Sequence, residues 1–431
     1  MATTTSTHDL GGNFTPENLF RLPIQYGTPL WIYDGDNIIK QISKLKQFDV
    51  IRFAQKACSN THILRLMKEQ GVKVDAVSLG EIERALYAGF QPGRDKSEIV
   101  FTADVIDVST LNRVIELDIP VNVGSIDMLG QIGKRQSGHP VWLRINPGFG
   151  HGHSQKTNTG GENSKHGIWY QDLPSAIEKI HAYGLKLVGL HMHIGSGVDY
   201  QHLANVCNAM LEQVKLCGED IQAISAGGGL SIPYEIGEEA VDTEHYYSLW
   251  HEIRQRIEQH LGHHVELEIE PGRFLVAESG ILMAEVRAVK SMGSRNYVLV
   301  DAGFNDLMRP AMYGSYHHIS VLSIEYDDNN ANLQGISLQE TSLQETLVAG
   351  PLCESGDVFT QLKGGEVMPR MLPQVNIGDY LIFHNTGAYG ASMSSNYNSR
   401  PLLPEVLFSE GKTRLIRRRQ TIEELLSLES F

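Results

Sequence analysis

Short apolar runs alternate with amphipathic segments between residues 50 and 270. The runs are rich in β-branched residues, as buried strands are, and the segments between them place apolar side chains at helical spacing. In the first such segment Ile63, Leu64, Leu66 and Met67 form one helix face, and Gly71 supplies a glycine cap. The alternation predicts repeated β-α-β units with strands at 50–54, 72–78, 98–103, 120–125, 140–146, 185–194, 221–227 and 265–270.

Eight strands of this kind favour a closed barrel. A TIM barrel uses eight parallel strands, whereas an open doubly wound sheet more often uses about five or six. The GxGxxG fingerprint of dinucleotide-binding folds does not follow the first strand. We therefore expect a TIM-like (β/α)8 barrel over residues 31–285.

The pattern changes after residue 285 to strands separated by turn residues. It predicts a separate antiparallel β domain over 286–431, with strands at 297–303, 319–326, 345–350 and 378–383. The polar run 327–335 is expected to be a hairpin tip or a loose loop, and 421–429 a short terminal helix. Residues 1–30 precede the barrel and could add an edge strand to either domain, with packing on the β domain one option.

The composition excludes some classes of partner. The 431 residues hold 51 Asp and Glu against 36 Lys and Arg, a formal charge of −15, which repels nucleic acid and anionic lipid at long range. The N-terminus lacks a signal-peptide pattern, and no apolar run reaches the length of a membrane span. We expect no nucleic-acid or membrane partner and a cytoplasmic protein whose four cysteines are free thiols.

Polar residues and glycines gather at the predicted strand ends, where the active sites of such barrels lie. Lysine follows the first strand, HMHIGS ends the sixth, three glycines end the seventh and EPGR ends the eighth. The residues concerned are Lys56, Asp75, Ser78, Asn146, His191, His193, Ser196, Gly227, Gly228, Gly229, Glu270, Gly272 and Arg273.

These residue types suit a phosphorylated aldehyde cofactor. A lysine in an enclosed mouth, with its pKa lowered by desolvation, can condense with an aldehyde, although a lysine after a strand is ordinarily a surface residue. The glycines can present N–H groups to a phosphate, with Arg273 adding charge; a tight turn would use them equally well. Glu270 beside a pyridine nitrogen would keep it protonated and make the ring an electron sink, the alternative being an ion pair with Arg273.

The HxH at 191–193 supports a competing class. Two histidines two apart on a strand share a face and can bind zinc, as in a metal-dependent hydrolase barrel, but further ligands at other strand ends are not evident. We expect no metal. The loop 151–166 is rich in His, Gly and Asn, and its length is typical of a mobile lid over the barrel mouth.

The motifs, taken in order, resemble the alanine-racemase-like barrel family of pyridoxal-phosphate enzymes, and within it the diaminopimelate decarboxylases, over essentially the whole chain. The resemblance rests on FAQKA, HMHIGSG, SAGGGL, EPGRFLVA, DAGFNDLMRPAMYG, GPLCESGD and GAYGASMSSNYNSRP. One departure is Cys58, where many relatives have Asn; its expected effect is on local packing.

The resemblance implies a role for each site residue. Lys56 forms a Schiff base with pyridoxal 5'-phosphate, His193 stacks on its ring and Glu270 pairs with the pyridine nitrogen. The phosphate would contact Ser196, Gly228, Gly229 and Gly272. Tyr389 closes over the cofactor. Substrate carboxylates would contact Arg273, Arg309 and Tyr313, and Cys353 with Glu354 would come from the partner subunit of a homodimer.

The implied reaction is decarboxylation of an amino acid, with Cys353 or Lys56 returning the proton. Arg309 can pair with the distal carboxylate of meso-diaminopimelate and Glu354 with its distal ammonium, which favours this substrate over ornithine. Alternatives are a decarboxylase of ornithine, arginine or carboxynorspermidine, a non-catalytic carrier of the cofactor, and the metal hydrolase. An arginine in place of Glu270 would be typical of the racemases.

Overall fold

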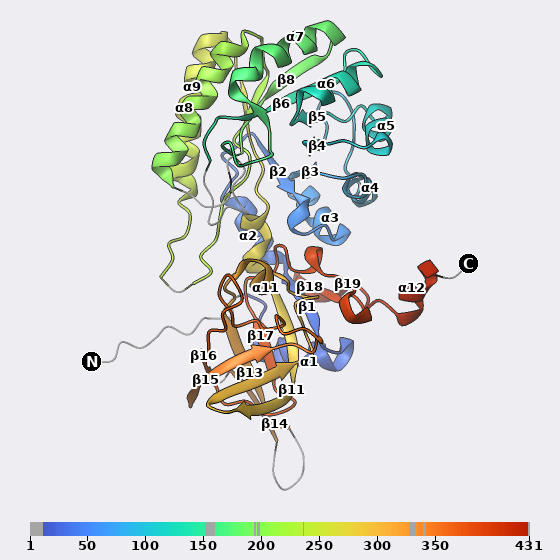
Figure 1. The fold of residues 1–431 in the computed structure, drawn as a ribbon, viewed down its shortest axis with the longest axis vertical. Coiled ribbons are helices and arrows are strands. Elements are labelled where there is room, and N and C mark those ends of the chain that lie inside the picture. Colours follow the sequence, from blue (N-terminus) through green and yellow to red (C-terminus); the bar gives the residue numbers. More distant parts are fainter. Residues whose placement is uncertain are drawn as a thin grey trace. The chain divides into compact units, whose positions relative to one another are not determined.

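The protein is represented by a computed structural model that describes residues 12–150, 160–193, 195, 199–235, 237–326, 333–338 and 342–429. It forms two compact units. One consists of Gln41–Ile232 and Glu239–Leu275, and the other of the chain up to Lys40, Pro233–Glu238 and the chain from Val276 onward (Figure 1). Residues 31–40 and 276–285, which we expected in the barrel domain, thus group with the second unit.

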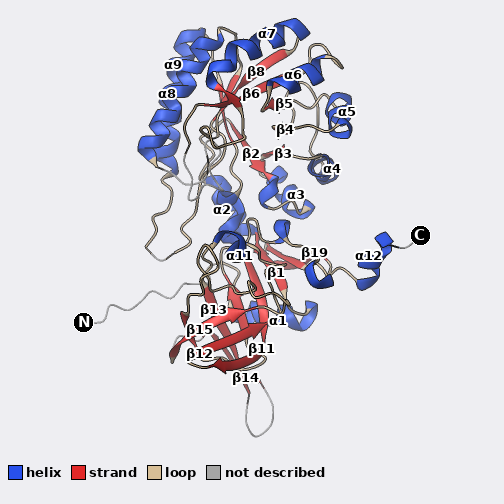
Figure 2. Ribbon diagram, viewed as in Figure 1, coloured by secondary structure: helices blue, strands red, loops and turns tan. Residues whose placement is uncertain are grey.

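The first unit is a closed parallel barrel ringed by helices (Figures 1 and 2). Among the described residues eight parallel strands pair in the order β2, β3, β4, β5, β6, β8, β9 and β10, and β10 pairs with β2 to close the ring. All eight predicted strands are confirmed. They are β2 (Val50–Ala54), β3 (Lys73–Ala76), β4 (Ile99–Ala103), β5 (Val121–Val123), β6 (Pro140–Asn146), β8 (Lys186–His191), β9 (Ala223–Ser225) and β10 (Glu266–Ile269).

Helices cover the outside of the barrel, and several of the amphipathic segments that follow the strands begin with a capping residue. Ser78 and Asp107 illustrate the caps, since their side chains accept hydrogen bonds from the backbone N–H groups of Glu81 and Thr110. Gly71, with φ +78°, follows α3 as predicted. The helices are α3 (Thr61–Glu69), α4 (Leu79–Ala88), α5 (Val108–Glu116), α6 (Ile126–Gly133), α7 (Leu173–Tyr183), α8 (Tyr200–Cys217), α9 (Thr243–Leu261) and α10 (Arg273–Val276).

The second unit is a β domain whose principal sheet runs β14-β13-β17-β11-β1-β18-β19. β12 pairs with β11 and β15, and β15 pairs with β16. The strands are β1 (Leu30–Asp34), β11 (Gly280–Met292), β12 (Arg295–Val300), β13 (Ile319–Tyr326), β14 (Leu333–Leu338), β15 (Leu343–Ala349), β16 (Arg370–Pro373), β17 (Tyr380–Phe383), β18 (Glu405–Ser409) and β19 (Lys412–Arg417). Short helices are α1 (Pro16–Tyr26), α11 (Arg309–Tyr313) and α12 (Ile422–Leu426).

Three details of this domain differ from the expectation. Its pairing is mainly antiparallel, but β1 pairs in parallel with β18, and β12 with β15. β1 is an interior strand between β11 and β18 rather than an edge; its first four residues are Leu, Trp, Ile and Tyr, and all five side chains, including that of Asp34, are buried. Residues 333–335, expected in a loop, begin β14; 327–332 lie outside the described residues. The terminal helix is present as α12, which begins with a capping box at Thr421.

The core of the β domain includes residues from both ends of the chain. Leu19 and Leu22 of α1 pack with Leu30 and Ile32 of β1 and with side chains of β11, β17 and β18. The N-terminal segment is therefore part of this core, consistent with the option that it packs on the β domain.

Candidate active site

The carboxyl ends of the barrel strands carry most of the predicted cofactor residues. Parallel strands end at the same rim of a barrel, so side chains far apart in sequence meet there. Lys56 lies in a short 3-10 turn (Gln55–Ala57) after β2, and His193 follows β8 by two residues. The glycines follow β9, and Glu270, Gly272 and Arg273 follow β10. Ser196 and the loop residues 151–159 lie outside the described residues.

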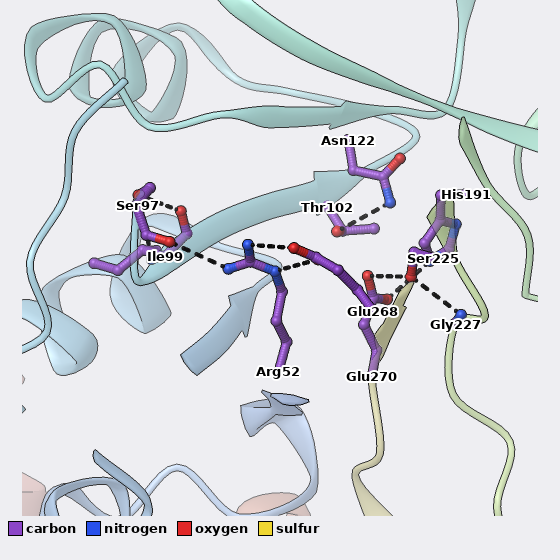
Figure 3. Close-up of polar contacts among 10 residues, drawn as sticks. All are labelled: Arg52, Ser97, Ile99, Thr102, Asn122, His191, Ser225, Gly227, Glu268 and Glu270. Carbon is purple, nitrogen blue, oxygen red and sulfur yellow. Dashed lines mark hydrogen bonds and ion pairs between the residues drawn. The ribbon is translucent and has the colours of Figure 1, made fainter. Parts of the chain in front are cut away.

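Glu270 is buried, and two neighbouring strands supply its hydrogen-bond partners (Figure 3). His191 Nε2 lies 2.8 Å from Oε2, and Ser225 Oγ donates to Oε1 at 3.1 Å. Burial acts to raise the pKa of Glu270, but the charge and hydrogen bond of His191, with a further contribution from the charge of Arg52, outweigh it and lower the pKa to about 2. The carboxylate is therefore ionised across the neutral range.

The His193 imidazole is fixed against the glycine segment. The backbone N–H of Gly228 donates to His193 Nδ1 at 3.0 Å. Burial, followed by the positive charges of Arg144 and Lys56, holds the pKa of His193 well below its usual range. The ring is thus a neutral imidazole that carries its proton on Nε2.

The glycine segment after β9, residues 227–229, leaves no room for a side chain at Gly228 or Gly229. Gly229 has φ +101°, and a Cβ there would lie 2.3 Å from the carbonyl oxygen of Gly195. A Cβ on Gly228 would lie 2.6 Å from the carbonyl oxygen of Glu270. Gly272 is less constrained, since its Cβ would meet Ala54 and Ala57, beside Lys56, at 3.3 Å. Only glycine allows this close approach of three backbone segments.

Lys56 is exposed at the rim. Its charge acts on Asp75 and on Glu81. Burial, together with the charge of Glu270, raises the pKa of Asp75 to about 8, against the effects of Lys56 and a hydrogen bond from Thr102. Asp75 is consequently protonated at neutral pH. Ser78, another strand-end residue, serves instead as the N-cap of α4.

Charged residues of the barrel interior were missed by the sequence analysis. Arg52 and Glu268 form a buried ion pair with two hydrogen bonds, and Arg144 of β6 is buried. The alternation of side chains along a strand could have revealed them, since Glu268 of β10 lies two positions before Glu270, and residues two apart in an extended chain share a face.

Asn146 connects residues at the two ends of the predicted lid, 151–166, by hydrogen bonds. Its Oδ1 accepts the backbone N–H groups of Gly148 and Gly161 at 3.1 and 2.9 Å, and its Nδ2 donates to the carbonyl of His166 at 3.2 Å. The His166 ring pairs with Asp104. The mobility of the segment stays a prediction.

The zinc alternative finds no support in the geometry. The two imidazoles of the HxH have different partners, Glu270 for His191 and the Gly228 N–H for His193. Within the described part of the chain no group of three or more His, Cys, Asp or Glu side chains is arranged to hold a metal ion.

Among the described residues no helix combines the length and apolarity that a membrane span needs.

Of the predicted substrate residues, Arg309 and Tyr313 belong to the β domain, whereas Arg273 begins α10 in the barrel unit. Arg309 begins α11 and is buried; its guanidinium donates to Ser315 Oγ at 3.1 Å and lies over the Tyr234 ring, 5.1 Å from the centroid. Tyr313 ends the same helix and is half-buried. Tyr389 follows β17 and has φ +57°, which is uncommon for a tyrosine.

Cys353 and Glu354 occupy an exposed turn after β15. The backbone N–H of Cys353 donates to Asn398 Oδ1 at 2.9 Å. The buried carboxylate of Asp357 accepts the N–H groups of Leu352 at 2.8 Å and Phe304 at 2.7 Å. Asp357 therefore links the turn to the segment that leads to Arg309.

The barrel residues fit pyridoxal phosphate. Crowded glycines offer backbone N–H groups for a phosphate, His193 presents a neutral ring, Glu270 is an ionised carboxylate able to pair with a pyridinium, and Lys56 provides an amine at the rim. This donor set suits an anionic aromatic aldehyde.

Known proteins share this sequence and architecture. Residues 36–277, more than half of the chain, match the family model of the pyridoxal-dependent decarboxylases, pyridoxal binding domain. The chain is 70% identical over 417 residues to a diaminopimelate decarboxylase of Escherichia coli K12, covering 97% of each chain, and 62% identical over 405 residues to that of Streptomyces coelicolor, covering 94% of this chain and 90% of the relative.

Solved structures agree. A crystal structure of a diaminopimelate decarboxylase superposes with a TM-score of 0.93 at 68% identity, covering 98% of this chain and 99% of that one. The diaminopimelate decarboxylase of Helicobacter pylori complexed with L-lysine superposes with a TM-score of 0.83 at 30% identity, covering 96% of this chain and 99% of that one. With the family model matched over residues 36–277 and both domains covered by the relatives, this chain belongs to the pyridoxal-dependent decarboxylases and, within them, to the diaminopimelate decarboxylase family.

Proposed function

We propose that this protein decarboxylates meso-2,6-diaminopimelate to L-lysine and carbon dioxide, the last step of lysine biosynthesis, with pyridoxal phosphate as cofactor. The observation that carries the proposal is the Glu270 carboxylate, which is buried and ionised at the barrel mouth. An anionic partner for the pyridine nitrogen favours decarboxylation over racemisation, since a strong electron sink stabilises the carbanion.

The barrel residues hold the cofactor. Lys56 binds its aldehyde carbon through the amine, and the neutral ring of His193 packs on its face. The N–H groups of Gly229 and Gly272, with the hydroxyl of Ser196 and the charge of Arg273, would bind the phosphate. Gly228, whose N–H donates to His193, would contact the phosphate through its backbone, and Tyr389 would contribute a phenol. When bound, pyridoxal phosphate accepts the electron pair that remains after carbon dioxide leaves.

Substrate binding uses residues of the β domain together with Arg273 of the barrel unit. Arg309, buried and oriented by Ser315 and Tyr234, pairs with the distal carboxylate, and Tyr313 and Arg273 assist in binding carboxylates. Glu354 pairs with the distal ammonium. An arginine that matches a second carboxylate distinguishes diaminopimelate from ornithine.

The proton that replaces carbon dioxide comes from Cys353, with Lys56 as the second candidate. Cys353 and Glu354 are exposed in this chain, which supports their use by the partner subunit of a homodimer. The dimer acts in the cytoplasm, where reducing conditions keep the thiol free.

The test is a product assay with purified protein and added pyridoxal phosphate. Incubation with meso-diaminopimelate should yield lysine and carbon dioxide in equal amounts, and Lys56→Ala should abolish both. Ornithine and arginine are assayed in parallel. No lysine from diaminopimelate would contradict the proposal, and a higher kcat/KM for either other amino acid would overturn the substrate assignment alone.

A further inference from the structure

His191 is a buried histidine whose ring faces the proposed cofactor carboxylate. It ends β8 and is 1% exposed. Its Nε2 lies 2.8 Å from Glu270 Oε2. Its Nδ1 is buried and has no hydrogen-bond partner among the described residues. The only polar contact that this ring makes there is therefore the one to Glu270.

Ser225 occupies the other oxygen of the same carboxylate. Its hydroxyl donates to Glu270 Oε1 at 3.1 Å and accepts the backbone N–H of Gly227 at 3.1 Å. Ser225 and His191 are direct neighbours in the register of β8 and β9, and Ser225 is paired with Glu268 of β10. Two adjacent strands thus present one donor each to the two oxygens of Glu270, as Figure 3 shows for the residues concerned.

This arrangement fixes both the direction and the charge of Glu270. An ionised carboxylate only accepts, so His191 must carry a proton on Nε2 whichever charge the ring has. A buried carboxylate without such donors would become neutral, because burial disfavours the charged form. The other charged groups around Glu270 are Arg52, Arg144 and Asp75, and the neutral ring of His193 lies nearby.

We propose that His191 is a positioning residue that keeps Glu270 ionised and oriented toward the pyridine nitrogen of the cofactor. The inference rests on the proposed function. His191 itself acts through Glu270 and does not touch the substrate, in contrast to the ring-stacking role assigned to His193.

Two substitutions separate hydrogen bonding from packing. His191→Leu fills the position of the buried ring with an apolar side chain and removes the hydrogen-bond donor. His191→Gln retains an amide N–H that can donate in place of Nε2. The dissociation constant for pyridoxal phosphate, measured by fluorescence titration of cofactor-free protein, should rise at least about tenfold in the Leu variant, since a hydrogen bond to a charged group is lost. The Gln variant should stay within about threefold of the wild type, and kcat should follow the same order.

A double-mutant cycle tests the route through Glu270. In a Glu270→Gln background, where no charge remains to be held, His191→Leu should change the dissociation constant by less than about threefold. An effect as large as in the wild type would overturn the inference, as would equal losses in the Leu and Gln variants.

A measurement on the wild-type protein covers the case in which the Leu variant does not fold. Nitrogen NMR of the His191 ring, assigned from the signal missing in His191→Gln, should show Nε2 protonated at pH 8. A bare Nε2 would overturn the inference. If the wild type bound cofactor and released lysine while His191→Leu matched it, only this inference would fail; a wild type that did neither would contradict the proposed function.

Discussion

Arg52 and Glu268 form an ion pair with two hydrogen bonds inside the barrel, Nε to Oε2 at 2.6 Å and Nη2 to Oε1 at 3.0 Å (Figure 3). Both side chains are almost fully buried, at 6% and 4% exposed. The guanidinium charge also acts on Glu270. The barrel of this protein therefore has a charged layer beneath its site instead of an entirely apolar core.

Removing one member of this pair should be costly. Glu268→Ala leaves the Arg52 charge buried without its partner, and we expect the free energy of unfolding to fall by about 3–5 kcal/mol. Urea unfolding followed by circular dichroism would measure it. The matched control is Glu83→Ala, which breaks the more exposed pair with Arg113 and should cost no more than about 1 kcal/mol. Equal losses in the two variants would contradict the assigned importance of burial.

Asp75 should make the cofactor-free protein less stable as the pH rises. Its pKa is about 8 in the folded chain against an ordinary value of 3.8. Between these values the folded chain holds a proton that the unfolded chain has lost, so the free energy of unfolding decreases with pH over this window. Asp75→Asn should flatten the slope, and unfolding at pH 5, 6, 7 and 8 would show it. Asp306, with a pKa raised by burial to about 7, contributes with the same sign, so some slope should remain.

The glycine segment should tolerate no side chain at Gly229. Gly229→Ala places a Cβ 2.3 Å from the carbonyl oxygen of Gly195 in addition to the strain of a positive φ. We expect the dissociation constant for pyridoxal phosphate to rise at least about tenfold, the equivalent of about 1.4 kcal/mol. Gly237→Ala is the control, since its φ is +95° but nothing lies within 4 Å of the added Cβ. Similar affinities of the two variants for pyridoxal phosphate would argue against the proposed role of Gly229 in binding the phosphate.

Cys353 should matter for turnover and not for cofactor binding. Cys353→Ala is expected to lower kcat with diaminopimelate about 100-fold or more, as for loss of a general acid, while the dissociation constant for pyridoxal phosphate is unchanged. Cys217→Ala, at a buried cysteine of α8, is the control. A Cys353 variant with normal kcat would transfer the proton-donor role to Lys56.

The sequence by itself determined the barrel and the residues around its rim. Strand and helix periodicities are local, and a parallel barrel places every strand end at one mouth, so Lys56, His193 and Glu270 could be grouped without knowing how any pair of strands is aligned. The same reasoning gave the β domain and its strands at 297–303, 319–326 and 378–383, but not the partners of each strand.

Only the tertiary structure decided which side chains meet. Arg52 and Glu268 are 216 positions apart, and His191 and Glu270 are 79 apart, so their contacts depend on strand register that no local pattern encodes. For the same reason the sequence did not show that residues 30–34 form the interior strand β1, because its place between β11 and β18 follows from pairing with residues 280–283 and 405–408.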